Sequence, residues 1–245
     1  MSLNLLSNAA AGRRLVAIGG AVLALTIVPA RAAEAETPTD ETRSLATARD
    51  IIARLDRRLR SVTTMRGRFV QTFVSSGLGM PQSESGRFWL SRPDRMRWEY
   101  TKPELKTAVS DGTHTWLHVP EDNVVYRGSV SEWRQGGAFA VLSEGRIGES
   151  FEARGLETAA ALKRGDVVLI LRPSAPRDDY ETLLIEVEPG TLRIAAVTAV
   201  DSMGNRIGAA FSDIEENVAL APDLFRFTPP PGARVLDQNE TGAPE

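Results

Sequence analysis

The chain has 245 residues, a formal net charge of −3 and no cysteine. The lack of cysteine argues against disulfide bonds, a thiolate nucleophile, a cysteine-ligated zinc site and the lipid-modified cysteine of a bacterial lipoprotein. The acidic balance argues against nucleic-acid binding, because neutralising phosphates requires a basic face.

Residues 1–32 have the pattern of a secretory signal peptide. Arg13 and Arg14 precede an apolar run over residues 15–28, and the small-residue site Ala30-Arg31-Ala32 follows it. This order predicts cleavage after Ala32, by the general secretory route or, because of the arginine pair, by the twin-arginine route. A membrane anchor is the alternative, but the run is shorter than the ~20 residues that cross a bilayer. We therefore expect a periplasmic protein that is not lipid-anchored.

The residues after this leader predict one folded domain. Residues 33–43 are polar and are expected to form a flexible linker, and residues 237–245 are expected to be a disordered tail. Between them, residues 44–236 are numerous enough to bury a hydrophobic core of their own.

The domain begins with a predicted amphipathic helix. From Ser44 onwards, apolar residues recur at intervals of three and four, as helical periodicity requires. They are Leu45, Ala48, Ile52, Leu55 and Leu59. Such a helix needs a hydrophobic surface on which to lie.

Period-two alternation predicts about ten strands further along the chain. They are expected at residues 65–74, 86–91, 96–100, 105–110, 113–119, 124–127, 167–171, 182–187, 192–200 and 207–214. Short helical pieces are expected after Ser131, over 138–142 and over 156–162. An antiparallel meander of this length has to curl or close to avoid flat open edges, which would place the helices over its concave side.

The segment from Gly86 to Tyr100 carries the clearest functional signal. Large apolar side chains alternate on both sides of the turn Arg92-Pro93-Asp94. Arg92 falls on the same parity as Phe88 and Leu90, so one cation is expected beside a concave apolar sheet face. This arrangement favours a container for fatty chains over a catalytic pocket.

Four motifs occur in the order found in a known family. They are Phe69-Val70-Gln71, Gly86 to Tyr100, Val109-Ser110-Asp111-Gly112 with Trp116, and Phe225-Arg226-Phe227-Thr228-Pro229-Pro230. They span roughly residues 45–236, and the chain resembles the LolA family of periplasmic lipoprotein carriers. The resemblance implies a mainly β fold with some helix: an incomplete antiparallel β-barrel of about ten or eleven strands, covered by a helical lid that encloses an apolar cavity.

The resemblance also implies a role for Arg92 and a set of partners. Arg92 falls on the family's arginine that hydrogen-bonds the lid backbone and holds the empty carrier closed. The implied cargo is an acylated lipoprotein, received from an inner-membrane ABC-type transporter and passed to an outer-membrane acceptor lipoprotein. We expect a monomer without cofactor, metal or catalytic residues.

Two sets of apolar residues are candidates for the lipid site. The cavity wall is assigned to Phe88, Leu90, Met96, Trp98 and Trp116, and the lid to Phe139, Val141 and Leu142. For each of them an ordinary core position is an equally good interpretation. For Arg92, the alternative is an ion pair with Asp94 or another nearby acid.

Other functions are weaker alternatives. A carrier or sensor of a different lipid, such as a glycolipid or a free fatty chain, would use the same fold. An exported lipid hydrolase would need Ser110, Asp111 and His114 to converge, but they straddle a turn and no nucleophile elbow is present. His114 and His118 share one face of a strand, where solvent-facing positions are favoured over a bridging metal site.

Overall fold

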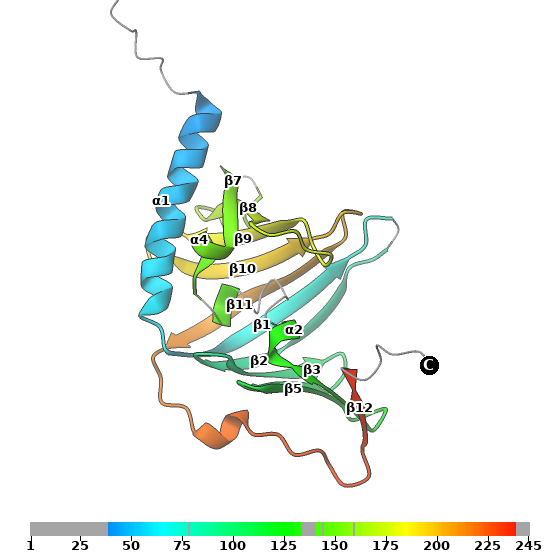
Figure 1. The fold of residues 1–245 in the computed structure, drawn as a ribbon. Helices are drawn as coiled ribbons and strands as arrows, with labels where there is room; N and C mark the ends of the chain where they lie inside the picture. Colours follow the sequence, from blue (N-terminus) through cyan, green and yellow to red (C-terminus); the bar gives the residue numbers. More distant parts are fainter. Residues whose placement is uncertain (1–38, 78, 134–140, 144, 159, 239–245) are drawn as a thin grey trace, which may run out of the picture. The chain divides into compact units, whose positions relative to one another are not determined.

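The computed structural model describes residues 39–238 apart from 78, 134–140, 144 and 159. The predicted leader, Phe139 and most of the predicted linker and tail lie outside the described residues. Within them the fold is dominated by one sheet of twelve strands in the order β12-β6-β5-β4-β3-β2-β1-β11-β10-β9-β8-β7 (Figure 1). Neighbouring strands are antiparallel, except that β12 is parallel to β6.

The strands in chain order are β1 (Thr64–Val74), β2 (Gln82–Ser91), β3 (Arg95–Lys102), β4 (Lys106–Asp111), β5 (His114–Val119), β6 (Val124–Ser129), β7 (Phe151–Glu157), β8 (Val167–Pro173), β9 (Thr182–Glu188), β10 (Arg193–Val200), β11 (Arg206–Glu216) and β12 (Arg234–Asp237). The described helices are α1 (Asp40–Arg60), α2 (Val130–Trp133), α4 (Ile147–Ser150) and the 3₁₀ turn η1 (Pro222–Phe225). Residues 141–143 are also helical.

Helix α1 begins earlier than the sequence pattern predicted. Thr39 caps it by accepting a hydrogen bond from the Thr42 amide, and Asp40 and Glu41 favour the first turn electrostatically. The helix therefore takes up residues 40–43, which were expected to belong to the flexible linker. Its apolar stripe is buried as predicted at Ala48, Ile52, Leu55 and Leu59; the remaining position, Leu45, is half-exposed.

All ten predicted strands are present, and the structure adds two. Strand β7 occupies residues that include part of the helical piece predicted over 156–162; that helix prediction is wrong. The alternation in β7 is interrupted by a bulge between Ala153 and Gly155, which hides its strand character. Strand β12 ends at Asp237, where the tail was expected to begin, and is held by its pairing with β6.

The sheet is open, as the prediction of an incomplete barrel required. Strands β7 and β12 are its two edges and do not pair with each other in the described part of the chain. Helix α1 packs against β7, and the Ser44 hydroxyl bonds both backbone groups of Leu156 (Figure 1). This contact covers part of an edge that would otherwise offer unpaired backbone groups.

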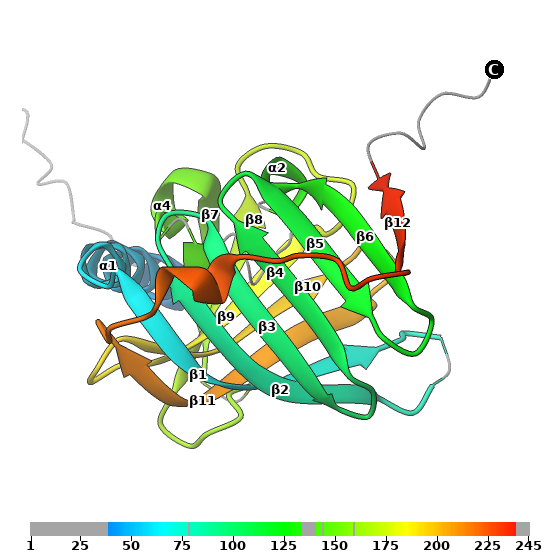
Figure 2. The same ribbon diagram turned by 90° about the horizontal axis from the view of Figure 1, so that it is seen from below.

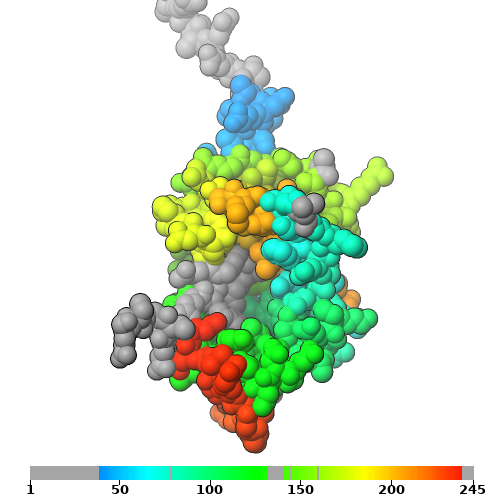
Figure 3. Space-filling view, turned by 90° about the vertical axis from the view of Figure 1, so that its right-hand side faces the viewer, coloured from blue at the N-terminus to red at the C-terminus, as the bar shows by residue number. Residues whose placement is uncertain are grey.

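The two faces of the sheet are covered by different segments. The inner face packs against α1, residues 141–143 and residues 145–151, and it carries the main apolar core. On the outer face, residues 217–233 cross β3, β4 and β5 before entering β12 (Figure 2). We call this segment the strap. Its Phe225 is 2% exposed, and Arg97 of β3 donates to the Leu224 carbonyl (3.3 Å). In Figure 3 the red end of the strap lies beside the green strands.

Candidate functional site

The side chain of Arg92 lies at the turn between β2 and β3 and connects three segments of the chain. Its Nε and Nη2 donate to the Leu142 carbonyl oxygen at 3.0 and 2.7 Å. Its Nη1 donates to the carbonyl oxygens of Val62 (2.7 Å) and Leu59. One guanidinium thus ties the β2–β3 turn to the end of α1 and to the helical residues 141–143.

The contact between Arg92 and the end of α1 is explained by the free carbonyl groups and the dipole at a helix C-terminus. The last carbonyls of a helix have no intrahelical partner, and the negative end of the helix dipole attracts a cation. Leu59 is one such residue of α1: its carbonyl oxygen accepts from the Val62 amide (3.1 Å) beyond the helix, and Arg92 adds a charged donor. Burial lowers the pKa of Arg92 to about 10, an effect partly opposed by the charge of Glu216. Arg92 therefore remains charged at neutral pH.

A second set of hydrogen bonds joins α1 to residues 145–150. We call these residues, together with residues 141–143, the covering segment. The Asp56 carboxylate, which is 8% exposed, accepts hydrogen bonds from the amides of Ile147 (2.7 Å) and Gly148 (3.0 Å). A carboxylate at this position satisfies amides at the start of α4. Sequence reasoning missed Asp56, although an acid beside the apolar stripe of a predicted amphipathic helix is a usable signal.

Gly145 lies between the two ties and has little space. Its φ is +61°, a conformation that residues with a Cβ atom seldom adopt. A Cβ atom there would also lie 3.2 Å from Leu59 Cβ and 3.3 Å from Arg92 Cζ. The covering segment can therefore approach Arg92 this closely because residue 145 is glycine.

Four of the five predicted wall residues come together on the inner face. Phe88, Leu90, Met96 and Trp98 are all buried in the main core cluster. Trp98 lies edge-on to Phe69, with ring centroids 4.5 Å apart, and further aromatic contacts extend this group. The predicted apolar face thus exists and is continuous.

Trp116 is the exception, and its assignment to the wall is wrong. In the register of the sheet, Trp98 lies opposite Ala108, and Ala108 lies opposite Leu117. Trp116 therefore points to the outer face, where its ring contacts Phe227 of the strap at 6.0 Å between centroids. Leu117 takes the inner position and packs against the core.

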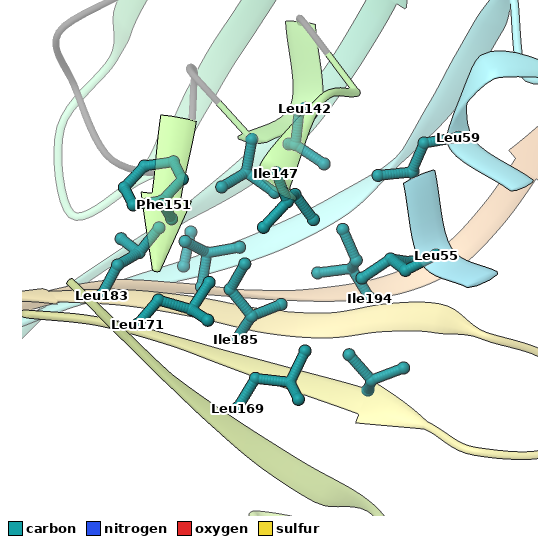
Figure 4. Packing of buried hydrophobic residues seen from close by; sticks show 14 of the residues in the cluster. Leu55, Leu59, Leu142, Ile147, Phe151, Leu169, Leu171, Leu183, Ile185 and Ile194 are labelled. Carbon is teal, nitrogen blue, oxygen red and sulfur yellow. The ribbon is translucent and has the colours of Figure 1, made fainter. Parts of the chain in front are cut away.

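The predicted lid residues that the structure describes are also part of the core. Val141 and Leu142 are each 1% exposed. Figure 4 shows Leu142 and Ile147 reaching toward the apolar side chains of the sheet, beside Leu55 and Leu59 of α1. The third lid residue, Phe139, lies outside the described residues, so a complete helical lid stays a prediction.

Beside the end of α1, the inner face has little free space. The space bordered by Leu59, Leu142, Met65, Phe211 and their neighbours measures about 10 Å³, which is about the room that one water molecule needs. A preformed cavity for acyl chains is not confirmed among the described residues.

The residues considered for hydrolysis build a turn instead. Ser110 is fully buried, and its hydroxyl donates to the Asp94 carbonyl (2.5 Å) and accepts from the Gly112 amide (3.3 Å). Asp111 Oδ1 accepts from the amides of Thr113 and His114. These contacts engage the groups that a catalytic triad would need free.

The histidines lie on the outer face beside the strap. His114 contacts Trp116 and His118 contacts Phe227, with centroids 5.7 and 5.9 Å apart. They were expected to face solvent; both lie on the outer face and are partly covered there. Within the described ranges, no group of three potential ligands is placed to hold a metal ion. Nor does any described helix have the length and apolar character to cross a membrane.

Comparison with known proteins shows the family of this chain. Residues 60–228 match the family model described as outer membrane lipoprotein carrier protein LolA. The chain belongs to the LolA family. It is 35% identical over 177 residues to an outer-membrane lipoprotein carrier protein from Methylibium petroleiphilum, covering 72% of this chain and 84% of that protein. It is 32% identical over 217 residues to an outer-membrane lipoprotein carrier protein from Alkalilimnicola ehrlichii, covering 88% of this chain and 90% of that protein. A solved LolA superfamily protein from Nitrosomonas europaea is 11% identical with a TM-score of 0.43, covering 75% of this chain and 97% of that one.

Proposed function

We propose that this chain is a periplasmic carrier that binds the acyl chains of lipoproteins against the inner face of its sheet. Its cargo would come from an inner-membrane ABC-type transporter and pass to an outer-membrane acceptor lipoprotein. The names of its relatives support the cargo class. The continuous apolar inner face, with Phe88 and Trp98 at its centre, supports acyl chains as the bound group.

The observation that carries the proposal is the set of hydrogen bonds from Arg92. They hold residues 141–143 and the end of α1 over the apolar face without any covalent link. A hydrogen bond with one charged partner contributes about 1.5–3 kcal/mol. Burying a methylene group contributes about 0.8 kcal/mol. Two to four buried methylenes therefore offset each broken bond, so a long acyl chain is able to displace the tie.

The same tie gives a reason for release. When an acceptor withdraws the acyl chains, Arg92 recovers its carbonyl partners and the apolar face is covered again by Val141 and Leu142. Closure thus lowers the free energy of the empty carrier and favours transfer away from it. A carrier without the tie would hold its cargo instead of passing it on.

Arg92→Leu tests this proposal. The variant is expected to fold and to accept lipoprotein, but to transfer it to the acceptor at least about tenfold less completely, because losing even one of these bonds removes about 1.5 kcal/mol of closing free energy. The measurement is the partition of a radiolabelled lipoprotein between carrier and acceptor at equilibrium. Arg87→Leu is the matched control, because Arg87 lies on β2, the strand that leads into the turn of Arg92, and is exposed. Equal transfer by both variants would show that the hydrogen bonds of Arg92 do not drive transfer.

Mass spectrometry of the protein purified from its own periplasm tests the cargo class separately. A co-purifying triacylated polypeptide is the expected result. A small lipid in its place would favour the alternative carrier of a glycolipid or fatty chain. A carrier that never keeps a lipoprotein in solution would contradict both.

A further inference from the structure

The outer face of the sheet holds a groove that the proposed carrier function does not use. It has a volume of about 450 Å³, within the range of small-molecule sites. Its floor and sides come from β1, β8, β9, β10 and β11, and from the loop between β7 and β8. The residues on this side of the strands alternate with those of the core, so the groove and the inner face lie on opposite sides of the sheet.

Small residues make the floor of the groove low. Ala196 and Ala210 lie opposite each other on β10 and β11, and Gly208 lies opposite Thr198. A Cβ atom at Gly208 would come within 2.5 Å of the Thr198 hydroxyl. The sides are taller and apolar: Val70 of β1 is 50% exposed and Leu162 of the β7–β8 loop is 76% exposed.

The loop that borders the groove is fixed by a buried carboxylate. Glu186 of β9 is 5% exposed and accepts hydrogen bonds from the amides of Leu162 and Lys163, both at 3.0 Å. Its charge is thereby engaged by the loop backbone. The apolar Leu162 is held at the groove although it is largely open to solvent.

A cationic side chain lies at the end of the groove opposite this loop. Arg206 begins β11, is exposed, and lines the groove beside Val74. In the part of the chain that the structure describes, its side chain forms no hydrogen bond or ion pair. The groove between this arginine and Val168 crosses from β11 to β8, three strand spacings or about 14 Å at ~4.8 Å each.

We propose that this groove binds a single alkyl chain that ends in an anion, such as a long-chain fatty acid or a lysophospholipid. The chain would lie over Ala196 and Ala210 with its end near Leu162, and the anionic head would pair with Arg206. A volume of about 450 Å³ suits one alkyl chain, which separates this ligand from a lipoprotein with several. The site is independent of the carrier function because it lies on the opposite face.

Photo-crosslinking with a diazirine derivative of palmitic acid locates the ligand. Peptides that contain residues 160–162 and 196–210 are expected to carry the label, and unlabelled palmitate should compete for it. Lysophosphatidylglycerol as a second competitor distinguishes the two sources of the anionic chain. Label confined to inner-face residues such as Phe69 and Phe88 would overturn the site while leaving the carrier proposal intact.

Two variants test the chemistry of the groove. Arg206→Gln removes the charge at an exposed position and is expected to weaken palmitate binding about fivefold, the effect of losing one exposed ion pair. Methyl palmitate has no charge, so its binding should not change. Ala210→Phe fills the floor and is expected to abolish groove labelling. Arg87→Gln, on the same face but outside the groove, is the control; equal binding by all three variants would refute the proposal.

Discussion

The guanidinium of Arg92 donates to three backbone carbonyls, and the sequence could not identify these acceptors. Its place in a recognised motif predicted a lid contact, but every residue has a carbonyl, so no side-chain pattern marks Leu59, Val62 or Leu142. Asp56 and Gly145 are better marked, as an acid beside an apolar stripe and as a glycine in a covering segment. Only the folded chain shows that all of these residues meet at one place.

Trp116 shows a second reason why the sequence could not place every side chain: the face that a strand residue occupies can depend on a distant segment. A strand alternates between two faces, and the sequence of β5 offers either Trp116 or Leu117 to the interior. The larger aromatic residue was assigned inward. The strap provides a second apolar surface through Phe227, a segment more than one hundred residues away, so the local pattern could not decide between the faces.

Substitutions of Trp98 and Trp116 are therefore expected to have different effects. Trp98→Ala is expected to reduce lipoprotein loading, because it removes a large part of the apolar inner face. Trp116→Ala should leave loading unchanged and destabilise the packing of the strap. A filter-binding assay with labelled lipoprotein measures loading, and urea denaturation measures the free energy of unfolding. Loss of loading in Trp116→Ala alone would restore the original assignment.

Tyr100 makes stability depend on pH in alkaline solution. Its hydroxyl donates to Gln71 Oε1 (3.2 Å). Burial, and to a smaller extent the charge of Glu84, raises the pKa of Tyr100 from 10.0 to about 12. Between these values the folded chain keeps a proton that the unfolded chain has lost. Tyr100 therefore contributes stability that is fully present below pH 10 and is lost as the pH rises through 12.

Tyr100→Phe should remove this contribution. Free energies of unfolding from urea titrations, taken at several pH values between 10 and 12, are expected to fall less steeply for the variant than for the parent protein. Comparing the two proteins cancels the titration of the other groups, including Arg92. Parallel pH profiles would show that the Tyr100 hydroxyl is not buried in solution.

At the scale of elements, the helix and ten strands followed from periodicity because each of these patterns is local. Strands β7 and β12 did not, because their conformation depends on pairing with β8 and β6. The covering segment was the hardest part to assign. Its short helical pieces are stabilised by Arg92 and Asp56, both distant in the sequence, rather than by helix length or repeated capping.

Asp56→Ala tests the tie between α1 and α4. Loss of the carboxylate leaves two amides without their acceptor and is expected to lower the free energy of unfolding by about 1–3 kcal/mol. Amide hydrogen exchange at Ile147 and Gly148 should quicken more than exchange within β9. Asp56→Asn, which keeps one acceptor oxygen, should show a smaller effect. Unchanged exchange in the alanine variant would mean that the covering segment is held by apolar packing alone.

At the scale of the whole domain, the open sheet has an apolar inner face that packs against α1 and the helical residues 141–143. The sequence predicted the incomplete barrel, the apolar face and the arginine. It also predicted an enclosed cavity, which stays a prediction; among the described residues, Val141, Leu142 and the apolar side chains of α1 pack against the inner face. We therefore propose that acyl chains reach the inner face only when residues 141–143 and 145–150 separate from α1.

A reversible cross-link tests this claim most directly. The natural chain has no cysteine, and a Cβ atom at Gly148 would lie 3.3 Å from Ile52 Cγ2, so Ile52→Cys with Gly148→Cys introduces a single disulfide between α1 and α4. The measurement is lipoprotein loading before and after reduction. We expect the oxidised protein to take up no lipoprotein and the reduced protein to load, with each single-cysteine variant loading under both conditions. Equal loading of the oxidised and reduced double variant would contradict the account.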